Sequence, residues 1–419
     1  MIQNNLKINY IKFIEGILLL IFLVLLVHFG QFTVILSSIA TVFLLILYLN
    51  KKNRRILSSK WEYVYIFFLF ILFVIESLYT SLNFNFIFYN YGIVFLILLI
   101  FPLYEVICTN KWDFFAKLNK IGIFVFFIKT VIWGAFNLLN KDLGFVGFGG
   151  RINWARSILG HTFFRMNGTF LDGFLFSYAL FKCLTTDNQK KKNEFLVEVI
   201  FLFLFSIFIY QSRAQIIYYL ISLLVGYLFF YSKKSNSVVN TVMFLMILLV
   251  FGFIFRNQIS DFWNSFSLNS ETYGGSTYVR MQEYTYFPSL WKKSNLLLGF
   301  GFFDDSNPIL FNNTRLYLSD VGILMQLYQF GILGFIIDIM PLIKGLNYFV
   351  TIWLKDFSKF DLFLIIFTAY VLVSCSNFNP YLNINFPILP LYISTLLYRT
   401  SIYFNDTYIE NSNHVLFNE

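Results

Sequence analysis

Residues 11–29 read IKFIEGILLLIFLVLLVHF, and this stretch decides the class of fold. A helix needs about 20 predominantly apolar residues to cross the hydrocarbon core of a bilayer, and the run meets that length. Lys7 and Lys12 flank its start, which places that end on the cytoplasmic side by the positive-inside rule. The run has no small-residue cleavage site, so we expect a retained first membrane helix and not a removed signal peptide.

Similar apolar runs recur along the chain, and the composition indicates that lipid is their solvent. Of the 419 residues, 58% are hydrophobic and only 13% are charged, whereas soluble globular chains carry about 25% charged residues. Inside a bilayer the backbone must satisfy its own hydrogen bonds, which leaves helices or a closed barrel. The runs are continuous and show no strand-like alternation. The sequence therefore predicts an all-α, polytopic membrane protein with one membrane domain over residues 1–419.

The apolar runs predict about twelve transmembrane helices. The lysines between them fall in short clusters on one side of the membrane, as expected of cytoplasmic loops. Both termini are then cytoplasmic, and the net charge of +9 does not indicate nucleic-acid binding. The predicted helices cover residues 11–29, 32–49, 63–81, 86–108, 121–139, 169–185, 195–211, 215–231, 238–255, 319–343, 360–377 and 383–399.

This topology leaves two long segments on the outer side, residues 140–168 and 256–318. The second is the large extracytoplasmic loop between the ninth and tenth helices. The basic residues on this side are mostly arginine, which the positive-inside rule does not explain. A guanidinium group offers a planar fork of donors that fits phosphate oxygens, so we predict a site for an anionic, phosphate-bearing substrate. The arginines in question are Arg151, Arg156, Arg165, Arg213, Arg256, Arg280 and Arg315.

Two of the arginine positions also have structural explanations. Arg165 precedes Gly168 and Asp172 in Arg-Met-Asn-Gly-Thr-Phe-Leu-Asp, where a glycine lets the backbone approach a ligand and Asp172 could orient it or take a proton. The alternative is an Arg165–Asp172 ion pair that holds the loop. Arg213 follows Gln-Ser in a turn between two helices, where an arginine can simply reach the lipid headgroups.

The segment 256–318 is too long to be an ordinary connection, and its aromatic and apolar residues predict short helices lying on the outer mouth. Gly299 and Gly301 form a Gly-x-Gly pair that permits close backbone approach. No strand precedes the pair, so it does not indicate a nucleotide-binding loop. Cys108, Cys183 and Cys375 have no metal-ligand or disulfide spacing, and the three histidines are scattered, so we predict no metal site and no cofactor.

Carboxylates lie inside two predicted spans, at Glu76 and Asp338, with Glu15 near the inner end of the first. Intramembrane carboxylates indicate proton or ion coupling and are the main residue-level argument for a transporter. They are not clustered in the sequence, and a backbone group or Lys129 could satisfy each of them.

The pieces Arg165-x-x-Gly-x-Phe, Ser212-Arg213, Arg280, Leu298-Gly-x-Gly and Gly331-Ile-Leu-Gly follow one another between residues 150 and 340. In this order, and with this topology, the chain resembles the bacterial polymerases of O-antigen and capsular polysaccharide repeat units. Their superfamily also contains the O-antigen ligases. Ligases typically carry a His-Asn pair where this chain has Asp320-Val321, so the resemblance favours a polymerase.

The resemblance implies a membrane-embedded glycosyltransferase of the bacterial plasma membrane. It would transfer a growing glycan from polyprenyl diphosphate to a sugar hydroxyl of a new lipid-linked repeat unit, without a metal and with inversion. The diphosphate-binding candidates are Arg165, Arg213, Arg280, Arg315, Arg151 and Arg156. Gly168, Gly299 and Gly301 would allow backbone approach. Asp320, Glu283 and Asp172, in that order, are candidates for the base that takes the acceptor proton.

The expected partners are the polyprenyl-diphosphate-linked oligosaccharide and the bilayer, with a flippase and a chain-length regulator as protein partners and no nucleic acid. Two alternatives stay open. A ligase-type transferase would attach finished glycan to another acceptor. A lipid-linked oligosaccharide flippase would place basic residues inside the bundle and have two related halves, which the sequence does not show.

Overall fold

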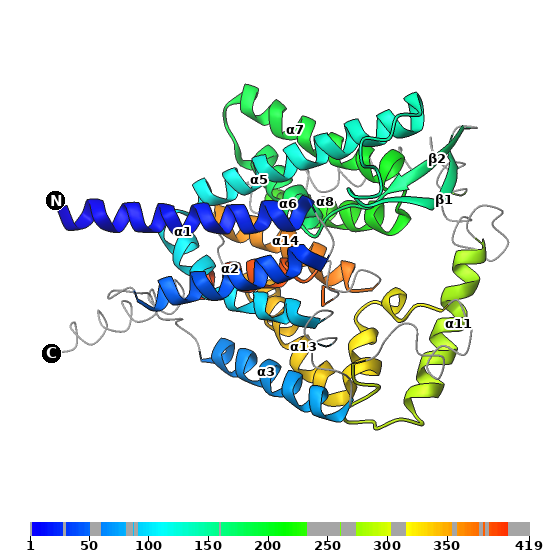
Figure 1. Ribbon diagram of the computed structural model, residues 1–419. Coiled ribbons are helices and arrows are strands. Elements are labelled where there is room, and N and C mark those ends of the chain that lie inside the picture. The colour runs from blue at the N-terminus through cyan, green and yellow to red at the C-terminus, as the bar shows by residue number, and fades with distance from the viewer. Residues whose placement is uncertain are drawn as a thin grey trace.

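The structure is a computed structural model dominated by helices that run side by side (Figure 1). Five helical stretches among the described residues are long and apolar enough to cross a membrane: Tyr10–Val27, Trp61–Tyr79, Gly92–Leu139, Arg213–Tyr231 and Leu324–Thr351. The prediction of a helical membrane protein is confirmed at this level. The structure describes residues 2–27, 31–50, 60–80, 87, 91–158, 161–232, 260, 274–302, 316–353, 358–376, 380–381 and 385–400. The predicted helix 238–255 lies outside them.

The helices follow the predicted runs with shifted ends. Their bounds are α1 (Ile2–Val27), α2 (Gln31–Leu49), α3 (Trp61–Tyr79), η1 (Gly92–Leu99), α5 (Ile100–Leu139), α6 (Asp172–Thr185), α7 (Gln189–Leu204), η2 (Phe205–Ile209), α8 (Arg213–Ser232), α11 (Gly274–Trp291), η3 (Leu318–Val321), α13 (Leu324–Trp353) and α14 (Lys359–Ser374). A further helix covers 388–400.

One predicted loop is replaced by a sharp kink. The expected helices 86–108 and 121–139 are continuous in α5, where Asn110 alone has non-helical backbone angles (φ −153°, ψ 58°). The chain nevertheless changes direction there. Tyr91, before η1, stacks near Phe302 at one end of the bundle, whereas Lys111 donates to Tyr398 Oη at the other, at 2.6 Å. Lysines 111, 117 and 120 therefore lie in the first turns after a kink and not in a loop.

The predicted loop 140–168 contains a pair of short strands that the sequence analysis did not predict. Strands β1 (Gly150–Ile158) and β2 (His161–Met166) form an antiparallel hairpin with an irregular register between Arg151 and Ala155. In β2 Met166 is buried, whereas Phe163, Phe164 and Arg165 are half-buried.

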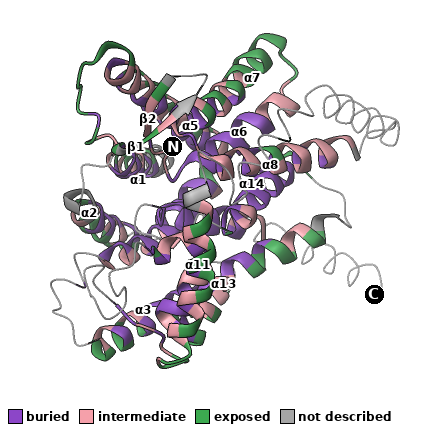
Figure 2. Cartoon of the chain, turned by 90° about the vertical axis from the view of Figure 1, so that its right-hand side faces the viewer, coloured by how far each residue is buried: buried purple, intermediate pink, exposed green. Residues whose placement is uncertain are grey.

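The core lies where α6 and α14 run through the middle of the bundle. Nearly every position of both helices is buried, and an end-on view shows them within a ring of helices that carry exposed positions (Figure 2). Membrane helices have no hydrophobic driving force between them and rely on close packing. Gly173 illustrates this, because a Cβ there would collide with the Tyr370 ring.

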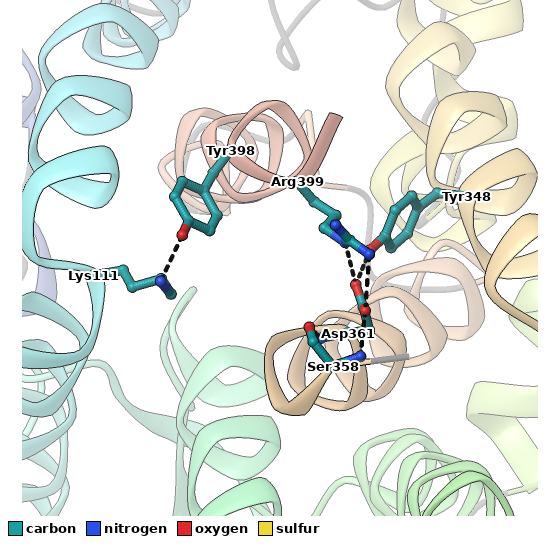
Figure 3. Close-up of polar contacts among 6 residues, drawn as sticks. All are labelled: Lys111, Tyr348, Ser358, Asp361, Tyr398 and Arg399. Atoms are coloured by element: carbon teal, nitrogen blue, oxygen red, sulfur yellow. Dashed lines mark hydrogen bonds and ion pairs between the residues drawn. The ribbon is translucent and has the colours of Figure 1, made fainter. Parts of the chain in front are cut away.

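The end of the bundle that holds the start of α14 carries an ion pair that the sequence did not predict (Figure 3). Arg399 Nε lies 2.6 Å from Asp361 Oδ1, and the Asp361 side chain is fully buried. Tyr348 Oη also donates to this carboxylate, and Ser358 closes a capping box with Asp361 at the start of α14. The charges of Lys191 and Lys359 act on Lys182 near this end, so the predicted cytoplasmic cations gather in space.

We expect Arg399→Ala to destabilise the protein by about 3 kcal/mol, because it leaves the buried Asp361 carboxylate without its cation. Arg399→Lys keeps the charge but loses the fork of donors, so its effect should be smaller. Thermal unfolding in detergent measures both variants against the unmodified chain. Equal midpoints for Arg399→Ala and the unmodified chain would contradict the prediction.

Candidate functional site

The hairpin is fixed to the outer end of α5 by side chains that bind its backbone. Trp133 Nε1 donates to Phe164 O at 2.8 Å, and Asn137 Oδ1 accepts from Phe164 N at 2.7 Å. Before β1, Asp142 accepts from the backbone N–H groups of Gly144 and Phe145, and the Phe145 ring stacks on Phe136. A short loop segment is thereby held rigidly on a membrane helix, as a binding site requires.

The hairpin places arginines side by side. Arg151 and Arg165 are directly opposite each other in the register, so both side chains leave the same face of the ribbon. Like charges in such a pair destabilise a hairpin unless an anion lies between or beside them. Burial, together with the charges of Arg156 and Arg151, lowers the pKa of Arg165 to about 10, and Tyr210 and Asp320 oppose that shift. Arg165 stays cationic at neutral pH, held where an anion would lower its energy.

The turn between η2 and α8 meets the hairpin. The π-helical η2 ends the preceding helix, and Gln211 adopts a left-handed backbone conformation (φ 53°) that is rare for a residue with a side chain. The Gln211 carbonyl accepts a hydrogen bond from Arg156 Nη1. Arg213 begins α8 two residues later. Strained backbone of this kind often marks functional sites.

Helix α11 contributes the third part. It lies at the same end of the bundle as the hairpin (Figure 1). Glu283 on α11 accepts from Tyr317 N at 2.8 Å and so ties α11 to the residues just before η3. The charges of Arg280 and Arg165 both act on Asp320 in η3. Residues distant in sequence therefore meet around Asp320.

The two carboxylates here have raised proton affinity. Burial raises the pKa of Glu283 to about 7; nearby Asp320 adds to the shift, and the Tyr317 N–H and Arg280 oppose it. Burial also raises the pKa of Asp320, although Arg280, Arg165 and a hydrogen bond from Ser319 oppose it. A carboxylate that titrates near neutral pH can accept a proton and release it again in one catalytic cycle.

The third carboxylate candidate has a different environment. Asp172 Oδ1 accepts from Thr169 N at 2.6 Å and from Thr169 Oγ1 at 2.7 Å, so it closes the loop between β2 and α6. The cation that acts on Asp172 is Lys129 of α5, which donates to the carbonyls of Asn167 and Gly168. A Cβ at Gly168 would collide with the Asp172 carboxylate. The close approach predicted at Gly168 is to this side chain.

Gly299 and Gly301 approach the chain's own backbone. Phe300 N and Gly301 N donate to the carbonyls of Tyr328 and Gln329 at 3.0 and 2.7 Å. Both glycines have positive φ, and a Cβ at Gly299 would lie 2.6 Å from Gly331 N. The Leu-Gly-x-Gly and Gly-Ile-Leu-Gly pieces of the sequence are thus the two halves of one contact, which we call the glycine joint (residues 295–302 with 328–333).

A cavity of about 270 Å³ lies beside the hairpin. Its wall combines the cations Lys129 and Arg151 with the peptide groups of residues 149–150 and 167–169. The apolar part of the wall comes from Leu25 and Leu26 at the end of α1, together with aromatic side chains. A cavity with a basic side and an apolar side suits an anionic group attached to a lipid.

The structure brings together Arg151, Arg156, Arg165, Arg280, Glu283 and Asp320, while Arg315 lies outside the described residues. The sequence analysis missed Tyr210 as a member of this region, and it considered Lys129 only as a partner for the intramembrane carboxylates. A lone lysine within an apolar run was the signal for Lys129. Among the described residues, no three His, Cys, Asp or Glu side chains gather to hold a metal ion.

Compared with models of known protein families and with the sequences of curated proteins, the chain shows no significant match.

Proposed function

We propose that the chain is a polysaccharide repeat-unit polymerase, a membrane-embedded glycosyltransferase acting on the outer face of a bacterial plasma membrane. In this proposal it has about twelve membrane helices, cytoplasmic termini and a large external loop over 256–318. The observation that carries the proposal is the meeting of Arg165, Arg280 and Asp320 from three distant segments at one end of the bundle.

The arginines suit the leaving group of such a reaction. As the glycosidic bond of a glycan–polyprenyl diphosphate breaks, negative charge develops on the diphosphate. Cations fixed before the reaction stabilise that charge in the transition state without having to reorganise. The like-charged pair Arg151–Arg165, with Arg156 adjacent, offers such a cationic surface. Arg151 also lines the half-apolar cavity, where the lipid-proximal part of the diphosphate would lie.

A carboxylate must take the acceptor proton. In the proposed step the acceptor hydroxyl oxygen bonds to the anomeric carbon, the carbon–oxygen bond to the diphosphate breaks, and Asp320 takes the hydroxyl proton. Attack opposite the leaving group inverts the anomeric centre. Asp320 is the first choice because the charges of both Arg165 and Arg280 act on it. Glu283 is second, and Asp172 is last because its carboxylate is occupied by Thr169.

Purified protein with lipid-diphosphate-linked repeat units as the only substrate tests the proposal. A ladder of longer lipid-linked glycans supports a polymerase, and sugars without the lipid diphosphate are the control. No ladder from folded protein with the cognate repeat unit would overturn it. A ligase would form glycan products only when a separate acceptor is added to the assay. If the chain is a flippase, a null mutant would accumulate repeat units on the inner leaflet.

Glu283 makes the protein sensitive to pH near neutrality. Its folded pKa of about 7 lies above the ordinary 4.5, so the folded state binds this proton more tightly. Stability should therefore fall as pH rises from about 4.5 to 7, while any base role of Glu283 makes polymerisation faster over the upper part of that range. Unfolding midpoints and ladder rates against pH measure both. Glu283→Gln should show a shallower stability slope, and an unchanged slope would contradict the assignment.

A further inference from the structure

A second cavity, of about 70 Å³, lies between α3 and α13 next to the glycine joint, and most of its wall is apolar. Its wall contains Glu76, Asp338 and Gln326 together with Tyr91 and Tyr381. The two carboxylates are the intramembrane acids that the sequence left unclustered, and the fold brings them to one cavity. The space is sufficient for an ion or a few water molecules and is too small for a sugar.

Several oxygen acceptors in this cavity have no hydrogen-bonding partner among the described residues. Glu76 is fully buried, and neither of its carboxylate oxygens has one. Gln326 is 2% exposed, and its Oε1 also has none. Asp338 is 4% exposed and lies on the same wall. Buried acceptors without donors are costly, and ionised carboxylates at membrane depth are costlier still.

Protonation alone does not satisfy every acceptor: even if an O–H on Glu76 donated to Gln326 Oε1, the second Glu76 oxygen would keep no partner among the described residues. A cation serves all of them together. We propose that this cavity binds a hard cation with oxygen ligands, held by the carboxylates of Glu76 and Asp338, the Gln326 amide oxygen and a tyrosine hydroxyl. Ca²⁺ takes such ligands in flexible geometry and balances two carboxylates. Na⁺ takes the same oxygens with a smaller charge.

The cation would join three parts of the outer half of the protein. Glu76 is on α3, Asp338 is on α13, and a Cβ at Gly301 would lie 3.2 Å from Glu76 Oε2. Phe302 N donates to Thr80 Oγ1 at 3.3 Å and its ring lies 4.4 Å from Tyr91, so the loop packs on the cavity. Binding would hold the loop 295–302, which follows α11 directly. This inference concerns a separate site and does not rest on the proposed polymerase activity.

Direct binding to the purified full-length chain in detergent, after chelation of bound metal, tests the proposal with ⁴⁵Ca²⁺ and ²²Na⁺ as separate probes. We expect saturable binding of one of them. Glu76→Gln and Asp338→Asn should each weaken it by about tenfold or more, since even indirect ligand contacts contribute that much to metal affinity. Asp187→Asn, which removes an exposed carboxylate between α6 and α7, should bind like the unmodified chain.

Thermal unfolding gives a second readout that needs no glycan substrate. The bound cation should raise the unfolding midpoint of the unmodified chain and of Asp187→Asn, and it should leave the midpoint of Glu76→Gln unchanged. Choline chloride keeps the ionic strength constant in this comparison. Without the cation, Glu76→Gln should unfold at or above the temperature of the unmodified chain, because it removes a charge from an apolar wall. Three outcomes would each overturn the proposal: the unmodified chain binds neither ion, Glu76→Gln binds as fully as the unmodified chain, or Glu76→Gln unfolds at a much lower midpoint in the absence of cation.

Discussion

Arg165→Ala should lower the rate of polymer formation by roughly 100-fold, the usual effect of removing one preorganised group that stabilises transition-state charge. Arg165 is the cation common to both halves of the site: the charges of Arg151 and Arg156 act on it within the hairpin, and its own charge acts on Asp320 in η3. Its removal leaves the developing diphosphate charge without its central partner. Arg280→Ala should have a similar effect from the α11 side.

The same ladder assay measures these variants at equal amounts of folded protein. Arg165→Lys keeps a point charge without the planar fork, so it should retain an intermediate rate. Lys141→Ala is the matched control, since it removes an exposed cation from the start of the same external loop. It should polymerise normally. Normal ladders from both Arg165→Ala and Arg280→Ala would rule out the arginines as the leaving-group site.

The two ends of the bundle carry different charged clusters: Asp361 pairs with Arg399 at one end, and the charges of Arg165 and Arg280 act on Asp320 at the other. The sequence predicts the side of each lysine cluster from charge alone and needs no contacts for it. Helix α14 connects the two ends: it starts at Lys359, and its C-cap residue Cys375 accepts from Ile323 N beside η3. Its sixteen residues span about 24 Å.

The remaining features were not predictable because they depend on contacts between distant segments. The hairpin is held on α5 by Trp133 and Asn137, which bind the backbone of Phe164 from a distant part of the sequence. The pairing of Glu76 with Asp338 at one cavity requires α3 and α13 to be neighbours. A single sequence gives the period of each helix but does not show which helices are neighbours. Clusters of side chains between helices can therefore be identified only in the structure.

Gly331→Ala should destabilise the protein by more than about 4 kcal/mol, which exceeds the effect of most single substitutions. Two costs combine at this position. Gly331 has φ 63° and ψ −164°, a backbone conformation essentially restricted to glycine, which costs a residue with a Cβ about 1–3 kcal/mol. The added Cβ would also lie 2.6 Å from Leu298 N, and backbone atoms cannot move aside as a flexible side chain can.

The consequence should extend beyond stability, because the glycine joint sets where α11 lies. Residues 295–302 follow α11, and Ile332 N and Leu333 N donate back to the carbonyls of Leu296 and Leu297. A displaced joint therefore moves Arg280 relative to Asp320. Gly134→Ala is the matched control, since no atom lies within 4 Å of the added Cβ and the position is inside α5; alanine there should be neutral or stabilising. Unfolding midpoints compare the two variants. If Gly331→Ala unfolds at the same temperature as Gly134→Ala, the joint does not hold the external segment in place.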